Sequence, residues 1–371
     1  MKGGIYSDDK CPVCGGMYVD NHLTALVCSK HPKCRAASFR VKFGDVKKRF
    51  RAYDDASRFL NGVRFKTDEL TFDPRDYKRN NPLSLLNLST KWLEYKKSEV
   101  RPHSYRSISN HVDKAQVYFG HMNVKDIRYG NLEDFTKSLS LADKTRHNIL
   151  STIHSFFVWL KRRQEITEVP EFPVISYDLG YRRTVDKATQ IAIVEEVKRI
   201  APEEKTYIGI LLLTTYFSIR PNEMRILKEG NIDMGNGYIY IPASDSKTEY
   251  KAIPLIKEDI ELFRSFNLSP FPETHFFRHE DGRDFGRNHF YRYWKKACKN
   301  LGVEDVDLYG GTKHSSARAL RRIHSPEEIQ RAMMTKSNKA FDRYFKVEAD
   351  DARTVYQSNR GVVIPLRKVG P

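Results

Sequence analysis

The cysteines of this chain are clustered, because four of the five lie between residues 11 and 34. Cys11 and Cys14 form a Cys-x-x-Cys knuckle followed by two glycines, and a second pair, Cys28 and His31, repeats the two-residue gap. Two knuckles at this spacing are typical of a tetrahedral zinc site, around which a short β-rich segment folds. We therefore predict a structural zinc ion in residues 1–50; reduced cysteines in a small β unit are the alternative. The favoured ligands are Cys11, Cys14, Cys28 and His31, with Cys34 a rival for the fourth place and His22 a weaker candidate.

A strictly alternating segment, residues 38–43, follows the knuckles. Its aromatic and aliphatic side chains are expected to face a core, while Arg40 and Lys42 face outward. Further basic residues follow at once, at positions 47, 48, 49 and 51. We predict that this strand and loop contact DNA, so that residues 1–50 form an accessory DNA-binding module. A solvated basic face, or a surface that holds a protein partner, is the alternative.

The charge of the whole chain favours an anionic partner. It has 371 residues with 64 Lys and Arg against 47 Asp and Glu, a formal net charge of +17. Double-stranded DNA is the first candidate, since each lysine or arginine that contacts a phosphate releases counterions. There is no apolar run of about 18 residues, and the N-terminal segment lacks an apolar signal core. A cytoplasmic, nucleoid-associated protein without a membrane partner is expected.

The middle of the chain is predicted to be helical. Apolar side chains recur near a 3.6-residue period through residues 82–168. The predicted helices cover residues 83–99, 104–118, 131–139 and 144–163. We assign the aromatic stripe of the last helix to the core. Its opposite side is basic, and the candidate phosphate ligands there are Lys144, Arg146, Lys161 and Arg162.

Composition shifts give the expected boundaries. Residues 51–81 are polar and are predicted to be a linker that includes one short helix from Asp54 to Leu60. Residues 169–186 form a second, proline-bounded linker. The last domain is expected to span residues 187–371 and to include a C-terminal tail.

The last domain contains two separate groups of motif residues. In the first group, an apolar helix ends before Arg220 and Glu223, and two predicted strands, 238–241 and 252–255, flank a turn with Lys247. The second group opens on Gly310-Gly311 with Lys313 and His314, and continues with a helix from Ser315 to Arg321. Another helix is predicted from Ser325, where an N-cap residue, a proline and two acids follow each other. This group ends at Arg343-Tyr344.

These two groups resemble the boxes of the tyrosine recombinase (phage integrase) family, as a divergent branch with an N-terminal zinc ribbon. The resemblance covers roughly the last half of the chain. It implies a multidomain, mainly α protein with a small β zinc ribbon, a four-helix SAM-like core-binding domain and an α+β catalytic domain.

The resemblance also implies a catalytic set. Tyr344 would be the nucleophile, Arg220 would bind the phosphate with Glu223 orienting it, and Lys247 would protonate the leaving oxygen. The sequence departs from the family pattern in its second and third boxes. Gly310 stands at a histidine position, Lys313 at an arginine position and Thr335 at a third-box histidine position, nine residues before the tyrosine. His314 is a candidate replacement for the missing histidine. The catalytic candidates are Tyr344, Arg220, Lys247, Lys313, His314, Glu223 and Thr335.

A site-specific recombinase is the function that the resemblance implies. Such an enzyme of a mobile element cleaves and rejoins DNA through a 3′-phosphotyrosyl intermediate. Its chemistry requires no cofactor, and the predicted zinc is structural. A catalytically impaired relative that binds DNA as an accessory or regulator is the second hypothesis, and a type IB topoisomerase is the third. Self-association, as a tetramer on paired sites, is expected. The tail from Gly361 onward would either bind the next subunit or fold back as an edge strand.

Overall fold

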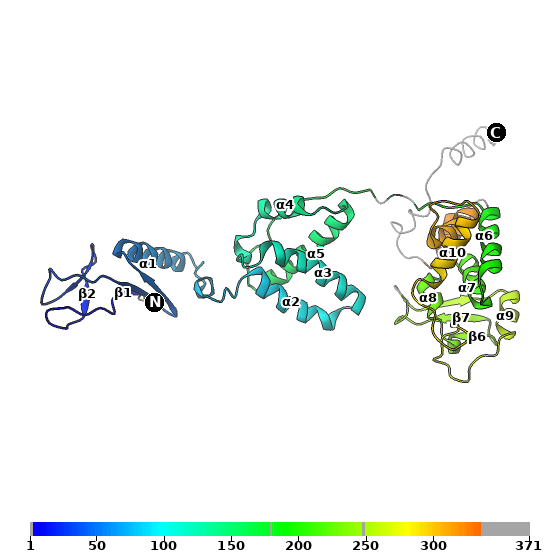
Figure 1. Cartoon of the computed structure of the whole chain (residues 1–371), viewed down its shortest axis with the longest axis horizontal. Helices are drawn as coiled ribbons and strands as arrows, with labels where there is room; N and C mark the ends of the chain where they lie inside the picture. The colour runs from blue at the N-terminus through cyan, green and yellow to red at the C-terminus, as the bar shows by residue number, and fades with distance from the viewer. Residues whose placement is uncertain (1–2, 179, 181, 247–248, 322, 335–371) are drawn as a thin grey trace, which may run out of the picture. The chain divides into compact units, whose positions relative to one another are not determined.

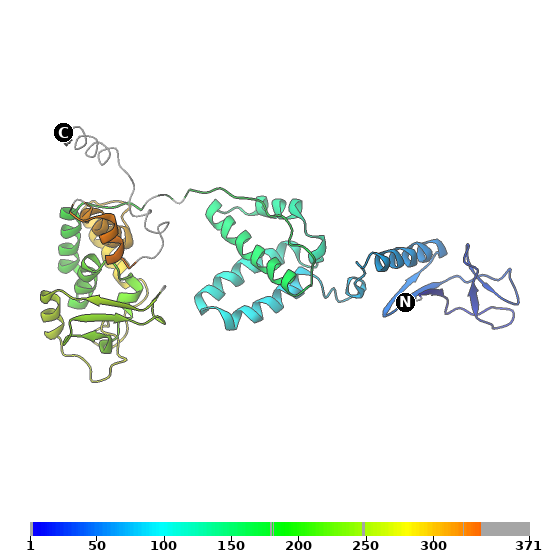
Figure 2. The ribbon, with the colours of Figure 1, turned by 180° about the vertical axis from the view of Figure 1, so that it is seen from behind.

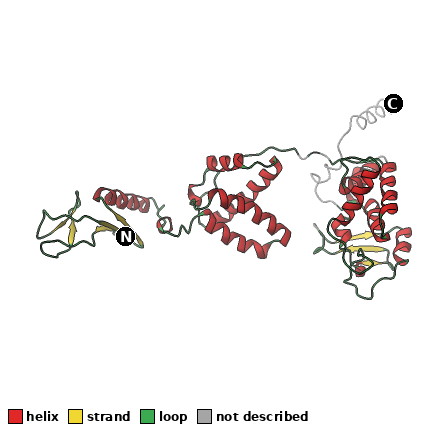
Figure 3. Cartoon of the chain, viewed as in Figure 1, coloured by secondary structure: helices red, strands yellow, loops and turns green. Residues whose placement is uncertain are grey.

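The computed structural model describes residues 3–178, 180, 182–246, 249–321 and 323–334 (Figure 1). The chain divides into two compact units between residues 179 and 180, and each unit is described by itself. The first unit contains a β-rich N-terminal module and a helical module, and the second contains mixed α and β elements (Figure 3). No helix within these ranges is long and apolar enough to cross a membrane.

The N-terminal module is built on two small antiparallel sheets and one helix. Its elements are β1 (Gly4–Tyr6), β2 (Tyr18–Asp20), β3 (Leu26–Cys28), β4 (Phe39–Phe43), β5 (Val46–Phe50) and α1 (Tyr53–Asp68). The first sheet has the order β1-β4-β5, and β2 pairs with β3 in the second. The alternation predicted for residues 38–43 is confirmed, since Phe39, Val41 and Phe43 are buried. This apolar face packs against α1.

Residues 51–81 differ from the linker expected there. Helix α1 has 16 residues. Its buried positions recur every three or four residues and belong to the core of the N-terminal module: Tyr53, Ala56, Leu60 and Val63. The helix is also longer than the predicted segment that ended at Leu60. Two acidic residues in its first turn and a lysine in its last turn favour it electrostatically.

The segment after α1 connects the two modules of the first unit. Phe72 and Tyr77 pack against the core of the N-terminal module. Charged groups of the 3₁₀ turn η1 (Pro74–Tyr77) and of its N-cap residue Asp73 contact the helical module. Lys125 donates to Asp73 at 2.7 Å and to Asp76 at 3.2 Å, and Arg75 pairs with Glu165. These contacts make residues 72–77 a packed connector.

The helical module follows the sequence prediction closely. Its helices are α2 (Leu85–Glu99), α3 (Pro102–Phe119), α4 (Tyr129–Ser138) and α5 (Asp143–Arg162), with a 3₁₀ turn η2 (Val124–Asp126). Ser84 caps α2 by accepting a hydrogen bond from the backbone of Asn87 at 3.2 Å. The aromatic stripe of α5 is core, as expected, because Phe156 and Phe157 are fully buried.

The second unit combines helices with a three-stranded sheet of order β6-β7-β8. Its helices are α6 (Lys187–Ile200), α7 (Glu204–Thr215), α8 (Pro221–Arg225), α9 (Lys257–Arg264), α10 (His289–Asn300), α11 (Ser315–Leu320) and α12 (Pro326–Ala332). Its strands are β6 (Ile232–Asp233), β7 (Tyr238–Ile241) and β8 (Lys251–Pro254), with a 3₁₀ turn η3 (Glu229–Asn231). Helices α6 and α10 lie side by side and both pack on α7 (Figures 1 and 2).

A five-residue π-helical turn, η4 (Gly310–His314), stands where the sequence indicated a Gly-Gly turn. Both glycines are there because the turn is tightly packed. A Cβ atom on Gly311 would overlap the indole ring of Trp294, and one on Gly310 would overlap the carbonyl oxygen of Arg183. Helix α12 begins with the predicted cap, since Ser325 accepts from the backbone of Glu328 at 3.2 Å.

Candidate active site and metal centre

Arg220 lies between the apolar helix α7 and the short helix α8. Helix α7 is buried on nearly all sides and ends at Thr215, and Pro221 at the first position of α8 fixes the direction of the next turn. Arg220 is the residue before that proline and has an extended backbone. Its side chain is 26% exposed, so the guanidinium is placed at the surface of the core and remains accessible to a ligand.

Glu223 is the centre of a buried polar cluster, and its two carboxylate oxygens receive separate sets of donors. Oε1 accepts from Arg220 Nη1 at 2.8 Å and from the buried hydroxyl of Ser246 at 3.3 Å. Oε2 accepts from the backbone N–H of Arg220 at 2.9 Å and from Lys251 Nζ at 2.5 Å. The predicted pairing of Arg220 with Glu223 is therefore present, and it is part of a larger network.

Lys251 was not singled out by the sequence. It opens β8, is 3% exposed and also donates to the carbonyl oxygen of Ser218 at 2.7 Å. The period of the strand could have indicated it, because Lys251 stands two residues before the buried Ile253 and therefore shares its inward face. A lysine at an inward strand position is costly unless it is paired.

The ionisation of this pair follows from its surroundings. Burial opposes the charge of Glu223, but the hydrogen bond and charge of Lys251, together with Arg220, outweigh it and lower the pKa of the carboxyl. Burial lowers the pKa of Lys251, and Glu223 opposes that effect. We treat both as charged, since each is the main hydrogen-bond partner of the other.

Lys313 is brought to the same cluster by η4. The side chain is buried, and the charges that act on it are those of Arg220, Lys251 and Glu223. Burial first, and then the two neighbouring cations, lower the pKa of Lys313 to about 7. The fold thus assembles three basic side chains around one carboxylate.

The turn that carries Lys313 is held from two sides. Gln190 on α6 donates to the carbonyl oxygen of Gly311 at 2.8 Å and to the hydroxyl of Ser316 at 3.0 Å. Ser316 in turn donates to the carbonyl oxygen of Thr214 at 2.7 Å, so α11 is tied to the end of α7. Residues after α11 pack on Phe217, just before Arg220.

The residues that enter the second unit also hold this turn. The backbone N–H of Val185 donates to the hydroxyl of Ser315 at 2.9 Å, and Arg318 donates to the Thr184 hydroxyl at 2.9 Å. Arg182 and Arg183 pair with Asp307 and Asp305, just before η4. Residues 182–185, near the end of the predicted linker, therefore pack along η4 and its flanking residues. We call this contact the seam.

His314 is buried next to Lys313 but differs from it in its charge near pH 7. Burial, and after it the charges of Arg182 and Lys313, lower the pKa of His314 to about 4. The imidazole is therefore neutral near pH 7, and its ring lies 5.5 Å from that of Tyr309. It can donate or accept a hydrogen bond there without adding charge to the cluster.

Three predicted catalytic residues lie outside the described residues, namely Lys247, Thr335 and Tyr344. Their roles stay predictions. Ser246, the last described residue before Lys247, contacts Glu223.

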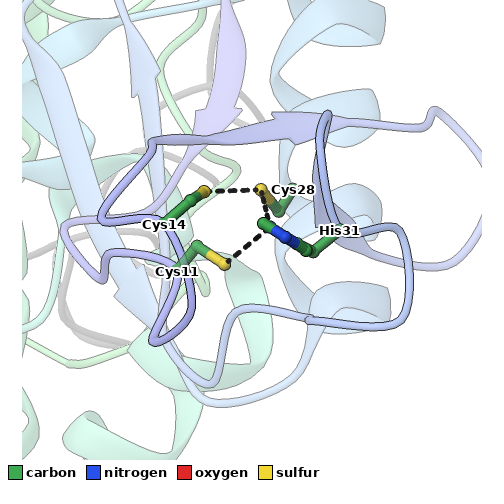
Figure 4. Close-up of side chains that lie close together, drawn as sticks. All are labelled: Cys11, Cys14, Cys28 and His31. Carbon is green, nitrogen blue, oxygen red and sulfur yellow. Dashed lines mark hydrogen bonds between the residues drawn. The ribbon is translucent and has the colours of Figure 1, made fainter.

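The predicted metal ligands come together in the N-terminal module (Figure 4). The ligand atoms of Cys11, Cys14, Cys28 and His31 all lie within 4.8 Å of one another. Cys14 Sγ is 3.5 Å from Cys28 Sγ, and His31 Nδ1 is 3.8 Å from Cys11 Sγ and 3.9 Å from Cys28 Sγ. A tetrahedral zinc ion with zinc–sulfur bonds of about 2.3 Å separates its ligand atoms by about 3.5–3.8 Å, so the donor set fits zinc. Cys34 is outside this group of four, although its thiol interacts with that of Cys11.

The predicted DNA-contacting residues are on two surfaces. Arg40 and Lys42 stand on the face of the β1-β4-β5 sheet opposite α1, paired in register with Arg49 and Lys47. On α5, Lys161 and Arg162 are exposed. The other two are partly engaged, because Lys144 Nζ donates to the hydroxyl of Tyr177 at 2.6 Å and Arg146 pairs with Asp143.

The sequence matches no protein-family model and no curated protein. Among solved structures, the Tn1549 transposon integrase in complex with a circular intermediate DNA matches with a TM-score of 0.60 at 14% identity, over 75% of this chain and 99% of that one. A lambda integrase dimer bound to a COC′ core site matches with a TM-score of 0.58 at 13% identity, over 88% and 98%. The XerH site-specific recombinase bound to a palindromic difH substrate matches with a TM-score of 0.57 at 17% identity, over 80% and 93%. The chain therefore has the fold of the tyrosine recombinases.

Proposed function

We propose that this protein is a site-specific tyrosine recombinase, integrase-like, that acts on double-stranded DNA in the integration or recombination of a mobile element. The single observation that carries the proposal is the buried cluster of Arg220, Lys251 and Lys313 around Glu223. Three basic groups and one carboxylate leave a net positive charge in a low-dielectric site, which favours binding of an anion. In this fold the fitting anion is the scissile phosphodiester.

The chemistry proposed is two successive transesterifications. The Tyr344 oxygen attacks the phosphorus, the bond to the 5′-oxygen breaks, and a 3′-phosphotyrosyl bond and a 5′-hydroxyl result. Negative charge accumulates on the non-bridging oxygens in the transition state, where the fork of Arg220 and the ammonium of Lys313 would stabilise it. Lys247 would give a proton to the leaving oxygen, and Thr335 would hydrogen-bond the phosphate. A second 5′-hydroxyl then reverses the reaction, so no external energy source is needed.

The first unit supplies DNA binding in this proposal. On the outer face of the N-terminal sheet, Arg40 lies opposite Arg49 and Lys42 opposite Lys47. Asp8 pairs with both Arg40 and Arg49, so the directly opposed Lys42 and Lys47 are the informative pair: like charges in such positions destabilise a sheet, and a polyanionic partner would stabilise them. The four Cys and His ligands would hold a structural zinc ion that folds this module. Exposed Lys161 and Arg162 on α5 are proposed as phosphate contacts of the helical module.

The second candidate is a catalytically impaired relative that binds DNA as an accessory. It is favoured by the ammonium of Lys313 in place of a guanidinium fork and by the glycine at position 310. Both candidates bind DNA, and only the recombinase forms a covalent intermediate.

A nicked suicide substrate separates the two candidates. The nick lets a short leaving strand diffuse away after attack, which traps the covalent protein–DNA adduct on a denaturing gel. We expect the wild-type chain to form the adduct, and Tyr344→Phe to form none while binding the same DNA, because only the attacking oxygen is lost. A wild-type chain that binds DNA but gives no adduct would establish the accessory candidate instead. An adduct with the phenylalanine variant would move the nucleophile elsewhere, and Tyr356→Phe would be tested next.

A further inference from the structure

Lys251 is a buried cation with two acceptors from different segments. Its ammonium group donates to Glu223 Oε2 at 2.5 Å and to the carbonyl oxygen of Ser218 at 2.7 Å, and both ionised side chains of the pair are 3% exposed. Burying an ion pair costs several kcal/mol of desolvation per ion, and a well-packed apolar pair is often no less stable. Stability alone therefore does not account for a charge at this position.

Glu223 is the group whose charge Lys251 affects directly. The carboxylate sits between two cations, because Oε1 accepts from the Arg220 guanidinium and Oε2 from the Lys251 ammonium. If Lys251 were neutral, more of the negative charge of Glu223 would act on Arg220, because Lys313 would be the one other cation of the cluster near the carboxylate. In a low-dielectric site, that charge would cancel most of the field that Arg220 directs at a bound anion.

We propose that Lys251 is a positioning residue for phosphate activation: it neutralises Glu223, so that Glu223 can orient Arg220 without cancelling its charge. The inference rests on the proposed function, in which Arg220 binds the scissile phosphate. The Lys251 ammonium acts on Arg220 through Glu223 and does not itself contact the substrate. Of Arg220, Glu223 and Lys251, the guanidinium is the most exposed, at 26%, which fits a division between one group that faces the ligand and two that support it.

The proposal predicts a particular dependence on the charge of the substrate. A methylphosphonate at the scissile position replaces one charged non-bridging oxygen with a methyl group, and tyrosine attack on it releases the same 5′-hydroxyl. Its transition state carries less negative charge, so it depends less on the field of Arg220. A residue that only holds the fold together would affect both substrates equally.

The experiment measures the rate of adduct formation on nicked substrates that carry a phosphate or a methylphosphonate. The variants are Lys251→Met, Glu223→Gln and the double variant, with Lys228→Met as the control. Lys228 is in the same unit and forms a 2.5 Å ion pair with Glu273. For Lys251→Met we expect a loss on the order of 100-fold on the phosphate, the size of a lost oxyanion-stabilising group, and a loss of less than about 10-fold on the methylphosphonate. The control should change neither rate.

The double variant provides a second test, which remains informative even if the single variant Lys251→Met loses activity through misfolding. In Glu223→Gln no carboxylate remains to be neutralised, so adding Lys251→Met should change the phosphate rate by less than about threefold. This is far below the loss expected for Lys251→Met alone, because the two residues are coupled. Equal losses on the two substrates, or a further large loss in the double variant, would overturn the inference. Failure of the proposed function has a different signature, since then the wild-type chain itself forms no adduct.

Discussion

Burial sets the charge of Lys313 near neutral pH. With a pKa of about 7 in the free protein, close to half of the molecules carry a neutral amine there, and the fraction grows as the pH rises. A bound phosphate favours the ammonium form, so DNA binding should take up a proton between pH 7 and pH 9. Affinity for a site DNA is therefore expected to fall in that range, to a larger extent than in Lys313→Arg, because arginine stays charged. Fluorescence anisotropy titrations of both proteins at several pH values measure this; parallel pH dependences would contradict it.

The same shift makes a prediction for stability. The lysine of the unfolded chain keeps its proton up to about pH 10.4, whereas the buried Lys313 loses it near pH 7. The unfolded state binds more protons between these values, so the free energy of unfolding contributed by this residue rises with pH across that window and is lost as the pH falls toward 7. Denaturant unfolding of the wild type and of Lys313→Met at pH 7 and pH 9.5 gives the difference. If the wild type and Lys313→Met differ in their free energy of unfolding by the same amount at pH 7 and at pH 9.5, Lys313 does not titrate in this range.

Removal or replacement of Lys313 tests its role in cleavage. Lys313→Ala should raise the barrier by on the order of 2–4 kcal/mol if this residue stabilises the transition state, whereas Lys313→Arg should keep or raise the rate, because a guanidinium restores the bidentate contact. The measurement is the rate of adduct formation on the nicked substrate. An alanine variant with the wild-type rate would transfer the role to His314 or Arg318.

The sequence could predict the part of the site that depends on local spacing. Arg220 and Glu223 stand three residues apart around a helix start, and their contact follows from that geometry alone. Lys313 could be assigned only by the spacing of its box, and its burial depends on Trp294 and on the segment 182–185, which are far away in the sequence. Lys251 lies one residue before the predicted strand 252–255 and was therefore not assigned to it. The available signal was its position two residues before the apolar Ile253, which places both side chains on the same face of a strand.

At the scale of elements, the metal ligands have the clearest consequence. We expect Cys28→Ser and His31→Ala to lose the zinc ion and Cys34→Ser to retain it, because Cys34 does not belong to the group of ligand atoms. Elemental analysis of the purified full-length variants measures this. Since α1 packs on the same small core, chelation should also lower the helical circular-dichroism signal. Equal zinc content in the His31 and Cys34 variants would contradict the assignment.

The basic face of the N-terminal sheet gives a second prediction at this scale. Replacing Lys42 and Lys47 together by alanine should weaken binding to all DNA sequences and lower the slope of log affinity against log salt by about 2, one for each lost phosphate contact. Arg58→Ala is the matched control, because Arg58 is exposed on α1, which packs on the opposite face. Salt titrations with equal slopes for the double variant and the wild type would remove this face from the DNA interface.

Periodic elements were predictable, and those defined by distant contacts were not. The four helices of residues 82–168 and strand β7 were indicated by apolar spacing alone. Helix α1 was shortened in the prediction although Val63 continues its buried stripe. The π-helical form of η4 had no sequence signal, because the hydrogen bonds from Gln190 and the contact with Trp294 hold it.

At the scale of the whole molecule, the proposal includes self-association on paired sites. Residues 361–371 lie outside the described residues, and their sequence includes a short apolar segment formed by Val362, Val363, Ile364 and Leu366. We expect deletion of these residues to weaken multi-subunit complexes on paired sites and to leave single-site binding nearly intact, as for a tail that binds a neighbouring subunit. Gel-shift titrations on both kinds of DNA measure this. Equal losses would mean that the tail is part of its own domain.

The seam between residues 182–185 and η4 has a mechanical consequence. Phe172 and Ile175 still pack against the helical module, so the chain leaves that module after them. It reaches the second unit at the seam, where the backbone N–H of Val185 donates to Ser315, two residues after Lys313. If both units hold the same DNA, tension in the connecting segment would act first at the ion pairs of Arg182 and Arg183 and then at Val185. The length of that segment would then determine how much force DNA bound to both units transmits to the seam.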